Sequence, residues 1–131
     1  IEGFAELKAL LERMGSPVKL VADEWCDSLD DVREFAGRRA AHLVQIKMPD
    51  LGSLGECIEA VLVAKAAGVG AYLGGSCAET DVSARLAAHV GVATQVDLLL
   101  AKPGMGVDEA ITIVGKPADG DRPLRVDDGP A

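Results

Sequence analysis

Two polar side chains at the end of an apolar run are the residues best placed to do chemistry. The run is Leu43–Lys47, and Pro49 follows it closely. Gln45 and Lys47 are two positions apart, so on a strand both project from the same face. A lysine in a pocket beside a divalent cation loses its proton more readily and can act as a base. The alternative is a lysine that extends to solvent.

Two other apolar runs end in groups of a similar kind. Val18–Ala22 leads to Asp23 and Glu24, and Gly70–Leu73 leads to the turn Gly74–Cys77. Carboxylates are oxygen ligands for Mg²⁺, but an acid after a strand can also cap a helix or be solvated. The turn could present backbone N–H groups to a carboxylate, or could simply need glycine for a positive φ. Three strand ends with polar groups indicate the active face of a parallel α/β sheet or barrel.

Apolar periodicity predicts the elements that hold these groups. The strand-like runs start near residues 18, 43, 70 and 95, a spacing typical of repeated βα units. A strand at Ile1 would make five such units, which could form an open sheet or the second part of an eight-stranded barrel. The beginning of the sequence and the lack of partner strands favour the barrel. The segments with helical spacing are 4–14, 28–39, 54–67, 79–90 and 107–114, and 115–131 is expected to be a loose tail.

Composition excludes several classes of function. The net charge is −8 and the sequence pI about 4.6, without a basic stripe, which argues against a nucleic-acid partner. There is no signal peptide and no apolar run long enough for a membrane span. Three widely spaced cysteines without a CxxC pattern predict free thiols and a cytoplasmic location.

Blocks in register along the chain resemble the methylaspartate ammonia-lyase family of the enolase superfamily. The resemblance covers about residues 18 to 114, and the matching blocks are Val21–Cys26, Val44–Lys47, Pro49–Gly52, Gly70–Tyr72, Gly74–Gly75, Cys77, Glu79–Thr80 and Leu100–Glu109. It implies the C-terminal part of a TIM-type barrel, with a partial barrel domain over 1–114.

The resemblance also implies roles for individual residues. Lys47 would take the C3 proton of (2S,3S)-3-methylaspartate, and loss of ammonia would then give mesaconate. Asp23 would be a Mg²⁺ ligand, and Gln45, Ser76 and Cys77 would contact the substrate. Glu2, in an Ile-Glu-Gly block, would be a second metal ligand, although it precedes Asp23 by fewer residues than in the family.

Cofactors and partners follow from the same resemblance. They are Mg²⁺, K⁺ as an activator, a small amino-diacid substrate, the missing N-terminal half of the enzyme, and further copies in a homo-oligomer. A third metal-binding Asp and a His on the opposite face of the substrate are absent, so the chain alone is expected to be inactive. The alternatives are another enolase-superfamily lyase or racemase, and a non-catalytic half-barrel that serves in assembly.

Overall fold

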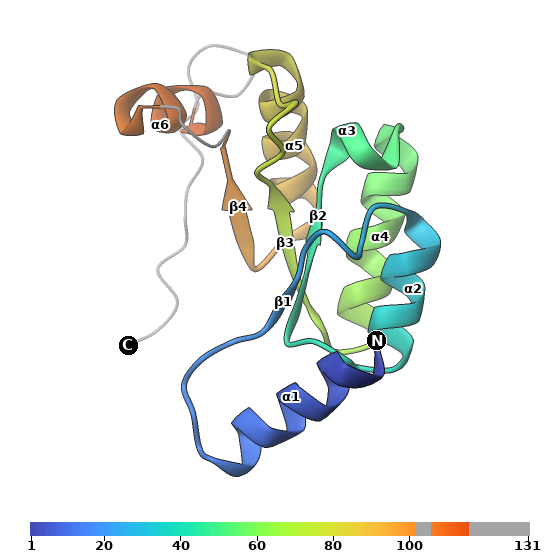
Figure 1. Ribbon diagram of the computed structural model, residues 1–131. Coiled ribbons are helices and arrows are strands. Elements are labelled where there is room, and N and C mark those ends of the chain that lie inside the picture. The colour runs from blue at the N-terminus through green and yellow to red at the C-terminus, as the bar shows by residue number, and fades with distance from the viewer. Residues whose placement is uncertain (102–105, 116–131) are drawn as a thin grey trace.

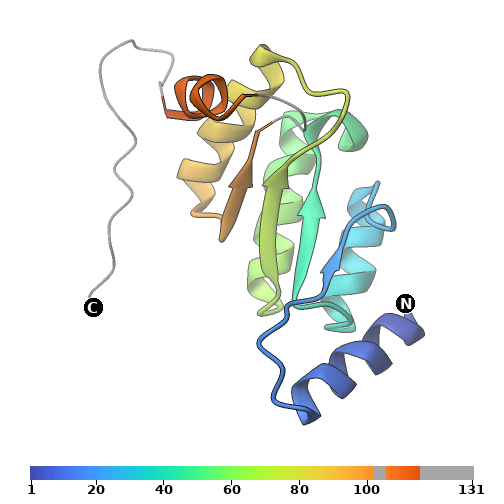
Figure 2. The ribbon, with the colours of Figure 1, turned by 60° about the vertical axis from the view of Figure 1, so that its left-hand side comes forward.

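The computed structural model describes residues 1–101 and 106–115, and its centre is a parallel sheet (Figure 1). The four strands are β1 (Val21–Ala22), β2 (Leu43–Ile46), β3 (Gly70–Gly74) and β4 (Leu98–Leu100). They lie in the order β1-β2-β3-β4, and each neighbouring pair is parallel. Their carboxyl ends therefore meet at one edge, as Figure 2 shows. This is the βα repeat expected from the sequence.

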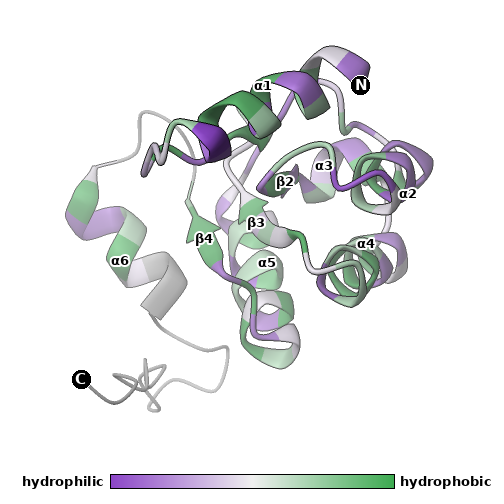
Figure 3. Ribbon diagram, turned by 90° about the horizontal axis from the view of Figure 1, so that it is seen from below, coloured by the Kyte–Doolittle hydropathy of each residue, from purple (hydrophilic) through white to green (hydrophobic). Residues whose placement is uncertain are grey.

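Three of the helices cover one face of this sheet. They are α2 (Leu29–Gly37), α4 (Leu54–Ala66) and α5 (Asp81–Thr94), and Figure 3 shows them on the same side of the strands. Alternation along β2 sends Val44 and Ile46 toward them, and both side chains are fully buried. Gln45 and Lys47 therefore project from the other face, as their spacing predicted.

Helix α1 (Glu2–Arg13) lies beyond the amino ends of the strands, and none of its residues is fully buried (Figures 1 and 2). The rings of Phe4 and Phe35 meet edge to face, with centroids 5.3 Å apart. His42 Nδ1 accepts a hydrogen bond of 2.8 Å from the backbone N–H of Leu20, and its Nε2 lies 3.8 Å from Glu12. The prediction of a strand at Ile1 was wrong, because Ile1 is the N-cap of α1.

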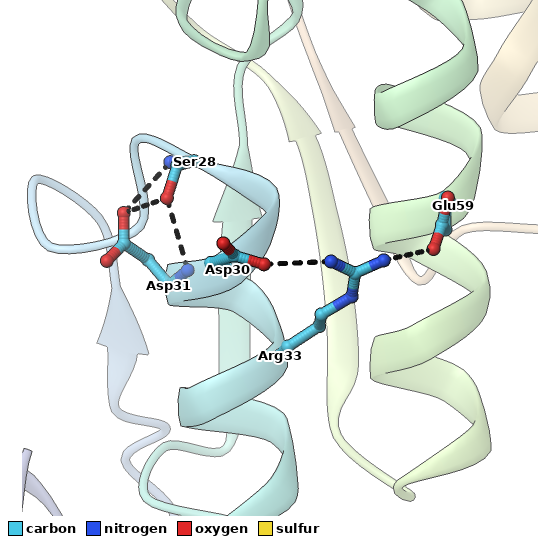
Figure 4. Close-up of polar contacts among 5 residues, drawn as sticks. All are labelled: Ser28, Asp30, Asp31, Arg33 and Glu59. Atoms are coloured by element: carbon cyan, nitrogen blue, oxygen red, sulfur yellow. Dashed lines mark hydrogen bonds and ion pairs between the residues drawn. The ribbon is translucent and has the colours of Figure 1, made fainter.

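Helix α2 begins at an N-cap that its own sequence supplies. Ser28 Oγ accepts from the N–H of Asp31, and the Asp31 carboxylate accepts from the N–H of Ser28, which is a complete capping box (Figure 4). One turn on, Arg33 bridges Asp30 at 2.8 Å and Glu59 of α4. These contacts fix the loop that follows Asp23.

Several boundaries differ from the prediction. A short helix, α3 (Met48–Leu51), begins directly after Lys47, because Pro49 has the φ of a first helical turn. Helix α5 starts two residues later than expected and continues to Thr94. Helix α6 (Val107–Gly115) confirms the last predicted helix, and Gly115 is part of it. The rest of the predicted tail lies outside the described residues.

All three cysteines are free thiols, as expected; Cys26 and Cys57 are buried and Cys77 is exposed. No helix in the described part of the chain combines the length and the apolar character needed to span a bilayer.

Candidate functional site

Lys47 and Asp23 come together at the carboxyl edge of the sheet. Lys47 follows β2 and Asp23 follows the adjacent β1, and Lys47 Nζ lies 2.6 Å from Asp23 Oδ1. The Lys47 side chain is only 10% exposed. Asp23 Oδ1 is buried and has no well-aligned hydrogen bond, so this pair is a close charge contact rather than a directed bond.

Glu24 is the second carboxylate beside this amine. Its Oε1 accepts a hydrogen bond of 3.4 Å from Lys47 Nζ, and its side chain is 79% exposed. Burial pushes the pKa of Lys47 down, but contacts with Asp23 and Glu24 outweigh burial and raise the pKa above its usual value. The sequence analysis expected a nearby cation to lower the pKa of Lys47. With only Asp23 and Glu24 beside the amine, the pKa of Lys47 is raised instead.

Gln45 lies beside the glycine turn at the end of β3. Its Nε2 donates a hydrogen bond of 2.9 Å to the backbone O of Gly74, and the residue is buried. A Cβ on Gly75 would lie 2.8 Å from the same Nε2 and 2.6 Å from Leu100 Cδ2, so a larger residue would displace these two side chains. With φ at +90° and +91°, Gly74 and Gly75 have the positive φ expected of this turn.

Ser76 and Cys77 follow in a turn closed by two hydrogen bonds. Ser76 Oγ accepts from the N–H of Ala78 at 3.1 Å, and the backbone O of Ser76 accepts from the N–H of Glu79 at 3.1 Å. The N–H groups of Ser76 and Cys77 donate to no acceptor among the described residues. Such free donors suit a carboxylate ligand. Ser76 is buried, whereas Cys77 is exposed.

Glu2 does not join this group. It is an exposed residue in the first turn of α1, and no ion pair or hydrogen bond among the described residues joins it to Asp23 or Lys47. Over residues 1–101 and 106–115, no three His, Cys, Asp or Glu side chains cluster as a metal site. Mg²⁺ nevertheless often binds through one or two carboxylates plus water and substrate. The buried Asp23 Oδ1, which lacks a hydrogen bond, fits one such ligand.

Glu79 was expected only as an acid that opens a helix. It is instead 1% exposed, and both carboxylate oxygens are buried without a hydrogen-bond partner among the described residues. The sequence offered two signals for Glu79: the spacing Ser76-Cys77-Ala78-Glu79, three residues from hydroxyl to acid, and the place of Glu79–Thr80 among the blocks of the family resemblance.

Comparisons with known proteins agree with this arrangement. Residues 1–119 match the family model described as the methylaspartate ammonia-lyase C-terminus. The chain is 54% identical over 114 residues to methylaspartate ammonia-lyase 2 of Carboxydothermus hydrogenoformans, covering 87% of this chain and 28% of that protein. It is 46% identical over 114 residues to the Clostridium tetanomorphum enzyme, covering 87% of this chain and 28% of that one.

Solved structures show the same similarity. The Mg complex of β-methylaspartase from Clostridium tetanomorphum has a TM-score of 0.80 and 47% identity over 86% of this chain and 27% of that one. The Citrobacter amalonaticus enzyme, solved with (2S,3S)-3-methylaspartic acid, has a TM-score of 0.76 and 41% identity over 87% of this chain and 28% of that one. The chain spans little more than a quarter of its relatives, less than the half that the resemblance implied.

The fold, the family-model match and the similar relatives agree. This chain belongs to the methylaspartate ammonia-lyase family of the enolase superfamily, and its four parallel strands alternating with helices correspond to the C-terminal part of the family's barrel.

Proposed function

We propose that this chain carries the base of an enzyme that eliminates ammonia from (2S,3S)-3-methylaspartate to give mesaconate. Lys47 is the base in this proposal. The observation that carries it is a nearly buried lysine at the end of a central strand, 2.6 Å from a carboxylate on the adjacent strand, in a chain of this family. A relative crystallised with (2S,3S)-3-methylaspartic acid supports the choice of substrate.

The reaction requires a base because a proton next to a carboxylate is very weakly acidic. The lone pair of neutral Lys47 Nζ takes the proton from C3 of the substrate. The C3–H electron pair becomes the new C2–C3 double bond, and the C2–N pair leaves with ammonia. The same face of β2 supplies Gln45, so base and amide lie on one side of the sheet.

Asp23 is the residue of this chain that would hold Mg²⁺, with Glu2 as a second ligand only if α1 were placed differently. When bound, the ion supplies positive charge next to the substrate carboxylate on which negative charge develops. An Asp23 carboxylate engaged with a cation no longer holds the Lys47 proton as strongly, which favours the neutral amine. The Mg complex of the Clostridium tetanomorphum relative supports this assignment.

Gln45, Ser76 and Cys77 are the substrate-contacting residues of the proposal. The N–H groups of Ser76 and Cys77, which donate to no acceptor in the described part of the chain, are suited to one substrate carboxylate, and the Ser76 hydroxyl adds a polar contact. Gln45 Nε2 is already bonded to Gly74, so in this arrangement its carbonyl oxygen is the end left for the substrate ammonium.

A chimera tests the proposal. The segment of the Clostridium tetanomorphum enzyme that aligns with this chain is replaced by the chain itself, and mesaconate is followed by its ultraviolet absorbance with Mg²⁺ present. We expect the chimera to form mesaconate and to lose that activity with excess EDTA. A folded chimera that forms none contradicts the proposal.

The same chimera separates the alternatives. Turnover of other amino acids or diacids, without turnover of methylaspartate, would identify another enolase-superfamily lyase or racemase. No turnover together with a stable assembly of the chain would favour the non-catalytic module. Mesaconate formation by the 131-residue chain alone would contradict the expectation that it is inactive by itself.

Three further properties belong to the proposal for the whole enzyme. They are activation by K⁺, assembly as a homo-oligomer, and a cytoplasmic location. The free thiols of Cys26 and Cys57 support the location, because buried thiols persist in reducing compartments.

A further inference from the structure

We propose that Glu79 is a positioning residue, whose buried side chain holds the turn of Ser76 and Cys77 at the start of helix α5. Its consequence for substrate binding rests on the proposed function, whereas its effect on the turn does not. Glu79 is not among the residues assigned above to the substrate or to Mg²⁺, and both of its carboxylate oxygens are buried.

The backbone of Glu79 closes the turn. Its N–H donates to the backbone O of Ser76 at 3.1 Å, three residues earlier. The next residue, Thr80, is the N-cap of α5, where its Oγ1 accepts from the N–H of Ser83 at 3.2 Å. Glu79 therefore joins a loop that carries two candidate substrate contacts to the first residues of a 14-residue helix. A change at this joint changes the direction in which the turn faces.

The side chain of Glu79 is buried, and helix α4 packs against α5, the helix that Glu79 precedes. Cys57, in the N-terminal part of α4, is fully buried, and burial followed by the charge of Glu79 raises the pKa of its thiol to about 11. The partial positive charge at the amino ends of α4 and α5 favours a carboxylate at this place.

Stability alone does not explain a glutamate here. A buried polar group without a hydrogen-bond partner costs free energy, and an apolar side chain of similar length would avoid that cost. Residues retained at such a cost are typical of sites where function opposes stability. The feature next to Glu79 that the proposed function uses is the turn of Ser76 and Cys77, whose N–H groups have no acceptor among residues 1–101 and 106–115.

Cys77 provides a direct measurement of the turn. It is the exposed thiol of the chain, and Cys26 and Cys57 are buried, so a maleimide or disulfide reagent reports on Cys77 first. In the 131-residue chain, Glu79→Ala should raise the rate of Cys77 modification about tenfold, because the turn loses its anchor. Glu79→Gln keeps the shape and should stay within about twofold of the original rate.

Two controls make this result specific. Asp81→Ala removes an exposed acid two residues away, in the first turn of α5, and should leave the Cys77 rate unchanged. Cys77→Ser should abolish the fast reaction. Equal Cys77 rates in the Glu79→Ala and Asp81→Ala chains would overturn the proposal.

Glu79→Met separates positioning from a merely structural role. We expect this chain to unfold at a higher urea concentration than the original, while the KM of the corresponding chimera for methylaspartate rises about tenfold with little change in kcat. A lower unfolding midpoint would show that the carboxyl has a stabilising partner, and an unchanged KM would show that it does not position the turn; either overturns the proposal. If the unsubstituted chimera forms no mesaconate, the proposed function fails, and the Cys77 rates still decide the role of Glu79.

Discussion

Replacing Gly74 by alanine should be far more damaging than replacing a glycine of similar conformation elsewhere. Gly74 is the last residue of β3, has φ +90°, and pairs with Leu100 of β4. A Cβ at Gly74 would lie well under 3.0 Å from the backbone O of Leu100, closer than real Cβ atoms are found. Because both groups belong to the backbone, no change of rotamer relieves the clash, and the two strands must separate.

The cost has two parts. A residue with a side chain in the left-handed region costs about 1–2 kcal/mol. Moving β4 away adds the loss of a ladder hydrogen bond, about 0.5–1.5 kcal/mol, and packing strain of about 1–3 kcal/mol. We therefore expect Gly74→Ala to lower the free energy of unfolding by roughly 3–6 kcal/mol, which is a large fraction of the stability of a marginally stable domain.

Gly68 is the matched control. It has φ +72° at the end of α4, and a Cβ there would meet nothing within 4 Å. Gly68→Ala should therefore show only the conformational part, about 1–2 kcal/mol. Urea unfolding of both variants, followed by far-ultraviolet circular dichroism, measures the difference. Equal losses in the two variants would refute the close approach of β3 and β4.

Three other predictions follow from the site and its supports. Lys47→Ala and Lys47→Arg should each reduce kcat of the chimera by about 10²–10⁴-fold, because neither side chain supplies a base. Mesaconate absorbance measures kcat, and activity retained by Lys47→Arg would contradict the role of Lys47 as the base. Burial, with the charges of Lys8 and Lys19, lowers the pKa of His42 below 6.5, so stability should be full above that pH and fall as the pH drops toward the folded value. Urea midpoints between about pH 8 and 5 test this, and His42→Gln should flatten the slope if His42 is its source. Ser28→Ala should cost about 1 kcal/mol by removing the capping box of α2, and an unchanged urea midpoint would contradict that.

Local chemistry in the sequence was enough for much of the fold. The helix cap at Ser28 and Asp31 depends on residues three apart, and the period-two alternation places Gln45 and Lys47 on one face. The order of strands and helices follows from similar short patterns. Helix α3 was missed because Pro49 was taken as a stop, although proline also suits a first helical turn.

The burial of α1 depends on the tertiary structure. Its apolar spacing predicts a helix with a buried face, and the helix is present, yet none of its residues is fully buried. Periodicity shows which side of a helix is apolar, but whether another element covers that side depends on the rest of the fold.

The sequence alone determined that this chain has polar groups at three strand ends and that Lys47 and Gln45 share a face. Only the tertiary structure decided that Asp23 lies 2.6 Å from Lys47 and that Glu79 is buried without a partner. The physical reason is that periodicity fixes the direction of a side chain from its own backbone, whereas its neighbours depend on strand register and on how closely distant backbones approach. At Gly74 and Gly75, that approach is what allows the turn to lie beside Gln45 and Leu100.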